Sequence, residues 1–252
     1  MTTIDLNVDA GESFGAWRMG DDAALFAEVS SANLACGFHA GDPGTMRASL
    51  AAALAAGVAI GAHPGLPDLV GFGRRPLSQT PKEVRDDTLY QVGAMYAFVR
   101  AAGATLHHVK PHGALNTAVA ETSDEHAEAL VEAVASFDAQ LPVVAIAGSR
   151  LHRAAQRLEH PVVAEGFPDR AYDASGSLAR RGTPGAIIHD ADVAAARAVR
   201  MVLDGTVEAL DGTVVRLAAG TLCIHGDNPG SVATARAIRA ALEREGIAIE
   251  AF

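Results

Sequence analysis

The chain has 252 residues, of which 49% are hydrophobic and 20% are charged, and this composition excludes a disordered chain. The net charge of −10 argues against binding to nucleic acid or to an acidic membrane. The N-terminus lacks the features of a signal peptide, and no apolar run is long enough for a membrane span. Two cysteines outside any CxxC pair indicate reduced thiols, so we expect a cytoplasmic protein.

Strands and helices alternate along the first half of the chain. The pattern predicts strands at Ile4–Val8, from Ser31, at Val58–His63 and at Thr105–Val109. It predicts helices at Asp21–Ser30, Thr45–Ala56 and from Pro81 to about Ala102. Thr80 followed by Pro81 and Glu83 is typical of a helix start, with Thr80 as the N-cap.

The alternation continues in the second half. We expect strands at Val143–Ala147, Val162–Ala164, Ala186–Ile188 and Thr221–Ile224, and helices at Ser123–Phe137, Arg150–Leu158, Asp190–Asp204 and Ser231–Glu245. A loop is predicted over Asp169–Arg181, a small hairpin at Asp211-Gly212 and a short tail over Ile247–Phe252. Repeated βα units predict a mostly parallel sheet in one domain over residues 1–252. Polar segments follow nearly every strand, which favours a closed barrel over an open sheet.

The polar residues after the strands would meet at one end of such a barrel. These residues are Asp9, Glu12, His39, Asp42, His63, Lys110, His112, Glu165, His225 and Asp227. Structural alternatives exist for several of them. Asp9 and Glu12 could cap the first helix, His63 could fill a turn, and Lys110 could be an ordinary lysine at a strand end. Cys36 and Cys223 are interpreted as small buried apolar residues.

Two chemistries suit this set of residues. Histidines and carboxylates could bind a divalent metal that activates water. Alternatively, carboxylates could act as general base and acid while Lys110 and arginines hold anionic groups. The sequence has no HExxH, P-loop, dinucleotide-binding or GxSxG motif, so it indicates none of the enzyme classes that these motifs mark.

Six segments, in order, resemble the LamB/YcsF family. They are DLNVDAGESFG at 5–15, SANLACGFHAGD at 31–42, GAHPGLPDLVGFGRR at 61–75, KPHGAL at 110–115, the segment 165–181, and TLCIHGDNP at 221–229. One departure is visible, because Asn116 and Thr117 stand where the family continues with Tyr-Asn. The resemblance implies an irregular TIM-like (β/α) barrel of about seven parallel strands, similar to glycoside hydrolase and deacetylase barrels.

The resemblance also implies an activity. It is the ATP-dependent hydrolysis of 5-oxo-L-proline to L-glutamate, with ADP and phosphate as products and Mg²⁺ accompanying ATP. Members of the family form the A component of 5-oxoprolinase and work together with subunits B and C. A lactam is a stable amide, and phosphorylation of its carbonyl oxygen would both drive and activate the hydrolysis. The missing P-loop fits a chain that does not handle ATP in the usual way or that relies on its partners for it.

Strand-end position and motif membership together suggest roles for individual residues. Asp9 or Glu12 is the expected general base, His112 or His225 the acid or base at the ring nitrogen, and Lys110 the stabiliser of negative charge. Asp227 completes the catalytic set. The residues expected to bind substrate are Asn7, His39, Asp42, His63, Arg74, Glu165, Arg170 and Arg180, with Arg74, Arg170 or Arg180 holding the substrate carboxylate. If a metal is bound, the candidates are His39, His63 and His112.

Two other functions fit the residues alone. One is an independent metal-dependent hydrolase such as a carbohydrate deacetylase. The other is a non-catalytic subunit that binds a lactam or a sugar for a partner. The oligomeric state stays open, a homo-oligomer included.

Overall fold

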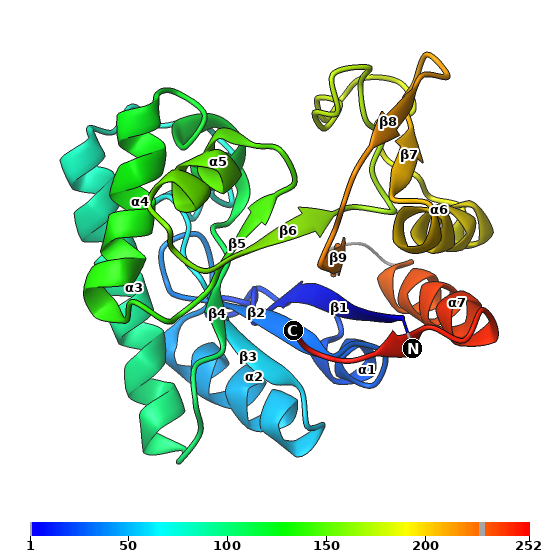
Figure 1. Ribbon diagram of the computed structural model, residues 1–252. Helices are drawn as coiled ribbons and strands as arrows, with labels where there is room; N and C mark the ends of the chain where they lie inside the picture. The colour runs from blue at the N-terminus through cyan, green and yellow to red at the C-terminus, as the bar shows by residue number, and fades with distance from the viewer. Residues whose placement is uncertain (1, 227–229) are drawn as a thin grey trace.

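The computed structural model describes residues 2–226 and 230–252 and contains a closed barrel of seven parallel strands (Figure 1). The strands are β1 (Thr3–Ala10), β2 (Ser31–Ala35), β3 (Ala59–His63), β4 (His108–Val109), β5 (Val143–Ile146), β6 (Val162–Gly166) and β9 (Thr221–Ile224). β1 pairs with β2 on one side and with β9 on the other, which closes the barrel. The predicted TIM-like barrel is confirmed.

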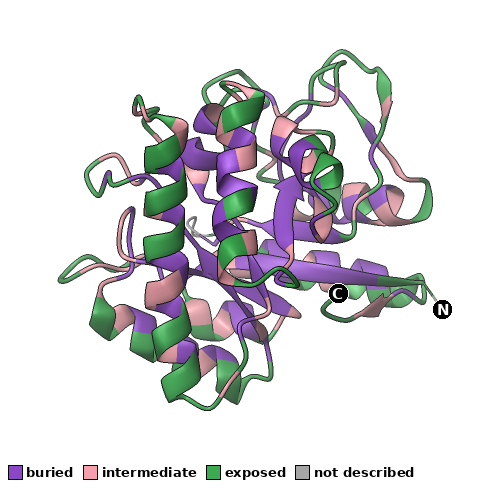
Figure 2. Cartoon of the chain, turned by 60° about the vertical axis from the view of Figure 1, so that its left-hand side comes forward, coloured by how far each residue is buried: buried purple, intermediate pink, exposed green. Residues whose placement is uncertain are grey.

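Helices surround the barrel, and Figure 2 shows their exposed outer faces around the buried strands. They are α1 (Asp22–Phe26), α2 (Pro43–Ala55), α3 (Pro81–Ala101), α4 (Asp124–Phe137), α5 (Arg150–Arg157), α6 (Ala191–Leu203) and α7 (Ser231–Arg244). The predicted start of α3 is confirmed: Thr80 accepts a hydrogen bond from the Glu83 amide, and the Glu83 carboxylate accepts one from the Thr80 amide. None of the described helices is long and apolar enough to cross a membrane.

The two faces of the barrel strands differ in chemistry. Side chains alternate along a strand, so Leu6 and Val8 of β1 point to the helices while Asn7 and Asp9 point into the barrel. Leu6 and Val8 belong to the apolar core beneath the helices. Asn7, in contrast, hydrogen-bonds to polar side chains from other strands. The barrel interior is therefore largely polar at the level of β1.

One glycine makes room inside the barrel for a histidine. A Cβ atom on Gly61 of β3 would lie within 2.2 Å of His108 Nε2. The absence of that Cβ lets the fully buried His108 ring reach Asn33 of β2, with 2.7 Å between Nε2 and Asn33 Oδ1. Gly61 therefore serves close packing across the barrel.

Several segments differ from the sequence-based expectation. The strand predicted at Ala186–Ile188 is wrong, because this segment makes only an isolated bridge between Ile187 and Arg170 and hydrogen bonds within the loop. The strand predicted over Thr105–Val109 is confined to β4. A π-helical turn, η1 (Leu115–Val119), was not predicted.

The hairpin predicted at Asp211-Gly212 is confirmed as β7 (Thr206–Glu208) and β8 (Val214–Arg216). In the C-terminal tail, β10 (Ala248–Ile249) pairs with the first residues of β1. That residues 1–252 form one domain stays a prediction.

Candidate active site

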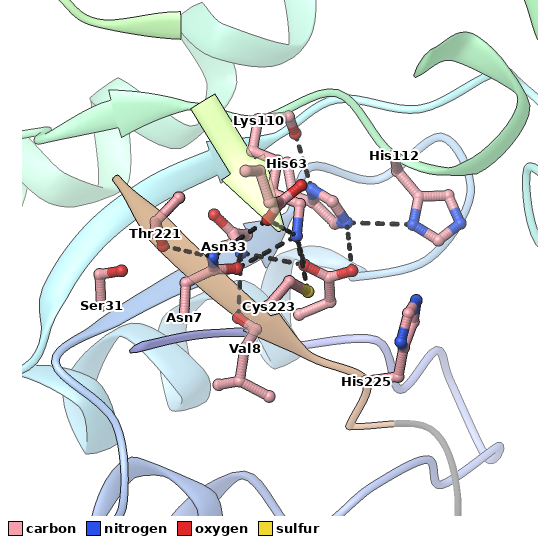
Figure 3. Close-up of polar contacts among 12 residues, drawn as sticks. Asn7, Val8, Ser31, Asn33, His63, Lys110, His112, Thr221, Cys223 and His225 are labelled. Atoms are coloured by element: carbon pink, nitrogen blue, oxygen red, sulfur yellow. Dashed lines mark hydrogen bonds and ion pairs between the residues drawn. The ribbon is translucent and has the colours of Figure 1, made fainter. Parts of the chain in front are cut away.

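Lys110 lies directly after β4 and is the central cation of the site (Figure 3). Its ammonium group donates to Asp9 Oδ1 at 2.9 Å and to Asn7 Oδ1 at 3.1 Å. The same nitrogen lies 2.7 Å from Glu165 Oε1 and 2.9 Å from Cys223 Sγ. Burial alone would lower the pKa of Lys110, but the neighbouring Asp9, Cys223 and Glu165 raise it well above its usual value. Lys110 is therefore a buried, permanently charged group.

The pKa values of the two carboxylates beside Lys110 are shifted in opposite directions. Burial acts to raise the pKa of Asp9, yet the charges of His63 and Lys110 hold that pKa well below its usual value. For Glu165, which is fully buried, burial prevails and the pKa is raised despite Lys110. Asp9 is consequently the more firmly ionised of the two, and it is also the one whose side chain reaches the cavity.

Beside this group lies a buried cluster of one carboxylate and three imidazoles. Ligand atoms of Glu12, His39, His63 and His112 all lie within 4.8 Å of one another. The rings of His39 and His112 stack with 3.8 Å between centroids. Burial, reinforced by the neighbouring histidines, lowers the pKa of both His39 and His112 well below the usual value. These imidazoles are therefore neutral, which is the form that binds metal ions.

Backbone carbonyls determine which ring nitrogens of this cluster carry protons. His63 Nδ1 lies 2.6 Å from the Lys110 carbonyl oxygen, and His112 Nε2 lies 2.9 Å from the Phe72 carbonyl oxygen. Since a carbonyl only accepts, both of these nitrogens donate. In a neutral His112 ring the lone pair is then on Nδ1, which lies 3.0 Å from His63 Nε2. His63 Nε2 also lies 3.4 Å from Asp9 Oδ2, which places this cluster in contact with the Lys110 group.

A further histidine outside this cluster, His225, follows β9 on another side of the site. Its Nδ1 lies 2.8 Å from Asp169 Oδ2, and its backbone amide donates to the same oxygen at 3.1 Å. The Phe167 ring packs on the imidazole with 5.6 Å between centroids. Burial tends to raise the pKa of Asp169, but the charge and hydrogen bonds of His225 lower it below its usual value. Asp169 is therefore an anion that orients His225.

A cavity of about 340 Å³ opens between these groups. Asp9, Lys110 and the two histidines His63 and His112 line it, as does His225. Its remaining lining includes the arginines Arg74, Arg170, Arg180 and Arg181 among neutral residues such as Phe167. Arginines around a small cavity suit an anionic ligand.

Comparisons with known proteins agree with this geometry. The model of the LamB/YcsF family matches residues 4–252. The chain belongs to the LamB/YcsF family. Two relatives are named as the A subunit of 5-oxoprolinase, and each is 54% identical to this chain. The match to the protein from Heliobacterium modesticaldum covers 98% of this chain and 97% of the relative. The match to the protein from Thermus thermophilus covers 99% of both chains.

Solved structures agree with the family assignment. The crystal structure of a lactam utilization protein from Thermus thermophilus superimposes with a TM-score of 0.95 at 52% identity, over 100% of both chains. A putative cellobiose-phosphate cleavage protein from Enterococcus faecalis has a TM-score of 0.54 at 13% identity, over 98% of this chain and 96% of the other, and shares the fold alone.

Most residues selected from the LamB/YcsF motifs lie together. The cavity is lined by Asp9, His63, Arg74, Lys110, His112, Arg170, Arg180 and His225. Glu12 and His39 lie behind it, in the cluster with His63 and His112. Arg170 is also engaged structurally, because its guanidinium donates to the carbonyls of Ala179 and Ala186.

Three of the selected residues lie outside both the cavity lining and the histidine cluster. Asp42 was expected to bind substrate but caps α2, where its carboxylate accepts hydrogen bonds from the amides of Gly15 and Gly44. Asn7 and Glu165 are buried beneath Lys110 and do not line the cavity. Asp227 lies outside the described residues.

Sequence reasoning missed four residues that shape the site. Asp169 begins the segment that the sequence predicts as a loop, although an acid just after a strand end is a usable signal. Arg181 lines the cavity beside Arg180. Asn33 was hidden inside a strand, where alternation alone would have pointed it inward. Cys223 was interpreted as apolar, yet its Sγ contacts Lys110.

Proposed function

We propose that this protein is the A subunit of a 5-oxoprolinase, which opens the lactam of 5-oxo-L-proline to L-glutamate while ATP is converted to ADP and phosphate. The observation that carries the proposal is the buried Lys110, held between Asp9 and Glu165 at the base of a cavity with arginine walls. The names of relatives 54% identical to this chain support the same function.

The position of each residue in the site suggests its role in the reaction. Asp9 is the general base for water, since it is ionised and reaches the cavity. Lys110 stabilises negative charge that develops on the substrate oxygen or on phosphate. Arg74, Arg170 or Arg180 holds the substrate carboxylate, and Arg181 adds to the same positive wall.

ATP is handled with partner subunits B and C in this proposal. The chain has no P-loop, so the phosphoryl group of Mg²⁺-bound ATP reaches the lactam oxygen with the help of the partners. A phosphorylated lactam carries more negative charge than the lactam, which agrees with the number of arginines around the cavity. Both cysteines are free thiols, which suits a reaction in the cytoplasm.

We also propose that Glu12, His39, His63 and His112 hold a divalent metal ion. The close approach of four ligand atoms, all within 4.8 Å of one another, supports this, as does buried His39, whose ring nitrogens make no hydrogen bond within the described chain. A bound metal would supply a Lewis acid next to Asp9. Elemental analysis of the purified protein should find about one metal ion per chain, and His39→Gln should lose it. His160→Gln, outside the cluster, is the matched control; metal-free wild-type protein would contradict the proposal.

The function is tested by phosphate release and glutamate formation from 5-oxoproline. The chain is assayed alone and with its B and C partners, with and without a chelator. We expect glutamate only from the complete mixture. Glutamate from the chain alone would show that it handles ATP itself. No glutamate in any mixture would overturn the proposal, and metal in that protein would then favour the deacetylase-like hydrolase.

A further inference from the structure

We infer that Asn116 binds the amide edge of the substrate, with its carboxamide accepting a hydrogen bond from the ring N–H and donating one to the ring carbonyl. The inference rests on the proposed lactam-opening function and names the residue that would distinguish a lactam from other rings of the same shape. It concerns this chain alone, because the family motif continues with Tyr where Asn116 stands.

Asn116 carries a buried polar atom that the protein leaves without a partner. The residue is 4% exposed, and its Oδ1 atom accepts no hydrogen bond within the described part of the chain. The hydroxyl of the next residue, Thr117, donates to the Gly113 carbonyl at 3.1 Å, so a neighbouring polar side chain in this segment is satisfied locally. An unpaired buried oxygen costs free energy, and most such atoms in folded proteins are hydrogen-bonded. The unpaired carboxamide therefore indicates a ligand that binds at this position.

The segment that carries Lys110 also sets the position of Asn116. Asn116 lies in η1, a few residues after Lys110, and both residues line the same cavity. The amide of Ala114 donates to the Gly73 carbonyl at 2.8 Å, which ties this segment to the loop that follows β3. Single π-helical turns are frequent at functional sites. Asn116 is thus held beside the cavity on the same anchored segment as the cation of the site.

The edge of a lactam complements a carboxamide. A five-membered ring holds its amide bond cis, so the N–H and the carbonyl oxygen lie on the same edge. A carboxamide offers one acceptor and one donor side by side, and it can form two parallel hydrogen bonds with such an edge. Asn has a broad range of rotation about its Cβ–Cγ bond, so the shielded Oδ1 can turn towards the ring N–H. The carbonyl oxygen has a second lone pair, which stays available to Lys110.

The rest of the cavity fits the rest of such a substrate. The arginines that line it suit the carboxylate, and Ile146, Phe167 and Leu178 supply an apolar lining for the two ring methylene groups. A lactone, with an oxygen in place of the N–H, would turn a lone pair towards Oδ1 of Asn116. Sites that bond a substrate N–H reject analogues that lack it, because their own buried polar atom then stays unpaired. The carboxamide should therefore make the site selective for lactams.

The first experiment separates a binding role from a structural one without any turnover. Asn116→Leu replaces the carboxamide by an apolar side chain of similar size. Since the carboxamide has an unpaired oxygen, its loss should leave the urea midpoint of the full chain equal to or above that of the wild type. Thr122→Val, at an exposed position whose hydroxyl bonds the Ala118 carbonyl, is the matched control. A clearly lower midpoint in Asn116→Leu alone would show that the carboxamide supports the fold, and would overturn the inference.

The second experiment measures two constants in the complete three-component mixture. They are the KM for 5-oxo-L-proline and the inhibition constant of 5-oxotetrahydrofuran-2-carboxylate, the lactone of the same shape. Asn116→Leu should raise the KM about tenfold or more, because the lactam loses both hydrogen bonds. The inhibition constant of the lactone should change much less, because the lactone has no N–H for Oδ1. Thr122→Val should leave both constants unchanged.

An unchanged KM in Asn116→Leu would overturn the inference, and so would equal increases in the KM and in the inhibition constant of the lactone. Either result leaves the proposed function standing, because the wild-type mixture still forms glutamate. A wild-type mixture that forms no glutamate would instead contradict the proposed function. The failure of the inference is therefore seen only in the variant, and the failure of the function is seen already in the wild type.

Discussion

The inner and outer faces of the same barrel strands follow opposite rules. Outward-facing Leu6 and Leu222 are fully buried against the helices, while inward-facing Asp5 and Asn7 are equally buried among polar groups. Burial of apolar area stabilises the fold, whereas burial of charge costs free energy unless each charge has a partner. The comparison shows that the outer face supplies stability and the inner face uses part of it to hold charges in place.

Hydrogen bonds on the inner face of the barrel reduce the free-energy cost of burying its charged groups. The Asp5 carboxylate accepts from Ser30, Ser31 and Thr221, and burial nevertheless raises its pKa. Asn33 donates to Asn7 and Asp9 and so links this lower group to the Lys110 group above it. The orientation of Asp9 and Lys110 therefore depends on polar side chains deep in the barrel.

The largest effect is expected from the central cation. Lys110→Met leaves Asp9 and Glu165 without their shared cation, so we expect a loss of about 3–5 kcal/mol in the free energy of unfolding. Turnover of the complete mixture should fall by orders of magnitude. Lys82→Met, at an exposed pair with Asp86, is the control and should leave stability nearly unchanged. Equal stabilities of the two variants, measured by denaturant unfolding, would break the comparison of the two faces.

An outer-face truncation should separate stability from activity. Leu6→Ala opens a cavity beneath the helices and should destabilise the protein by about 2–5 kcal/mol. The turnover of the protein that remains folded should be unchanged, because Leu6 points away from the site. Leu54→Ala, at a partly exposed position of α2, should cost much less. A specific loss of turnover in Leu6→Ala would mean that the faces are not independent.

The buried hydrogen bond between His108 and Asn33, on the inner face of the barrel, should affect both stability and turnover. His108→Leu removes the donor to Asn33 Oδ1 and should cost about 1–3 kcal/mol of stability. Because Asn33 also binds Asp9, we expect kcat to fall while KM changes little. His160→Leu is a matched control: His160 is also buried and bonds the Leu141 carbonyl, but far from the site. If both variants lower stability and neither lowers kcat, the proposed link from His108 to Asp9 is absent.

The smallest effect on stability should come from Asp42, the N-cap of α2 outside the barrel. Amide and hydroxyl donors around Asp42, the Gly15 amide foremost, lower its pKa to about 2. Asp42→Ala should cost about 1 kcal/mol at neutral pH. Because the pKa of Asp42 is lowered in the folded protein, its ionised carboxylate stabilises the fold fully at pH values above the usual pKa of 3.8. This stabilisation is lost as the pH falls towards 2. The difference in the free energy of unfolding between wild type and Asp42→Ala should therefore shrink between pH 4 and pH 2. A gap that stays constant with pH would refute the assignment.

Much of the fold followed from local patterns in the sequence. The alternation in residues 4–8 and the capping signal at Thr80 predicted elements that are present, and the βα repeat predicted the barrel. The strand predicted at Ala186–Ile188 failed because a short apolar run satisfies the pattern of a strand without any neighbouring strand to pair with. Strand identity there depends on tertiary pairing, which periodicity does not contain.

The candidate site was predictable where chain position alone brings groups together. Parallel strands deliver Asp9, His63 and Lys110 to one end of the barrel, so their proximity followed from topology. The pairing of Asp169 with His225 joins two segments 56 positions apart through a single oxygen. Likewise, Cys223 contacts Lys110 across the barrel. Such contacts depend on side-chain direction, and one sequence does not specify it.

The missing Cβ of Gly61 has an evolutionary consequence. Any side chain at that position would collide with the His108 ring, so the two positions cannot change independently. Descendants that acquire alanine or a larger residue at position 61 should have replaced His108 first, so ancestors reconstructed for this barrel should never combine such a residue with His108. A side chain at position 61 would then record, in a single codon, that a lineage had already lost the imidazole at the centre of its barrel.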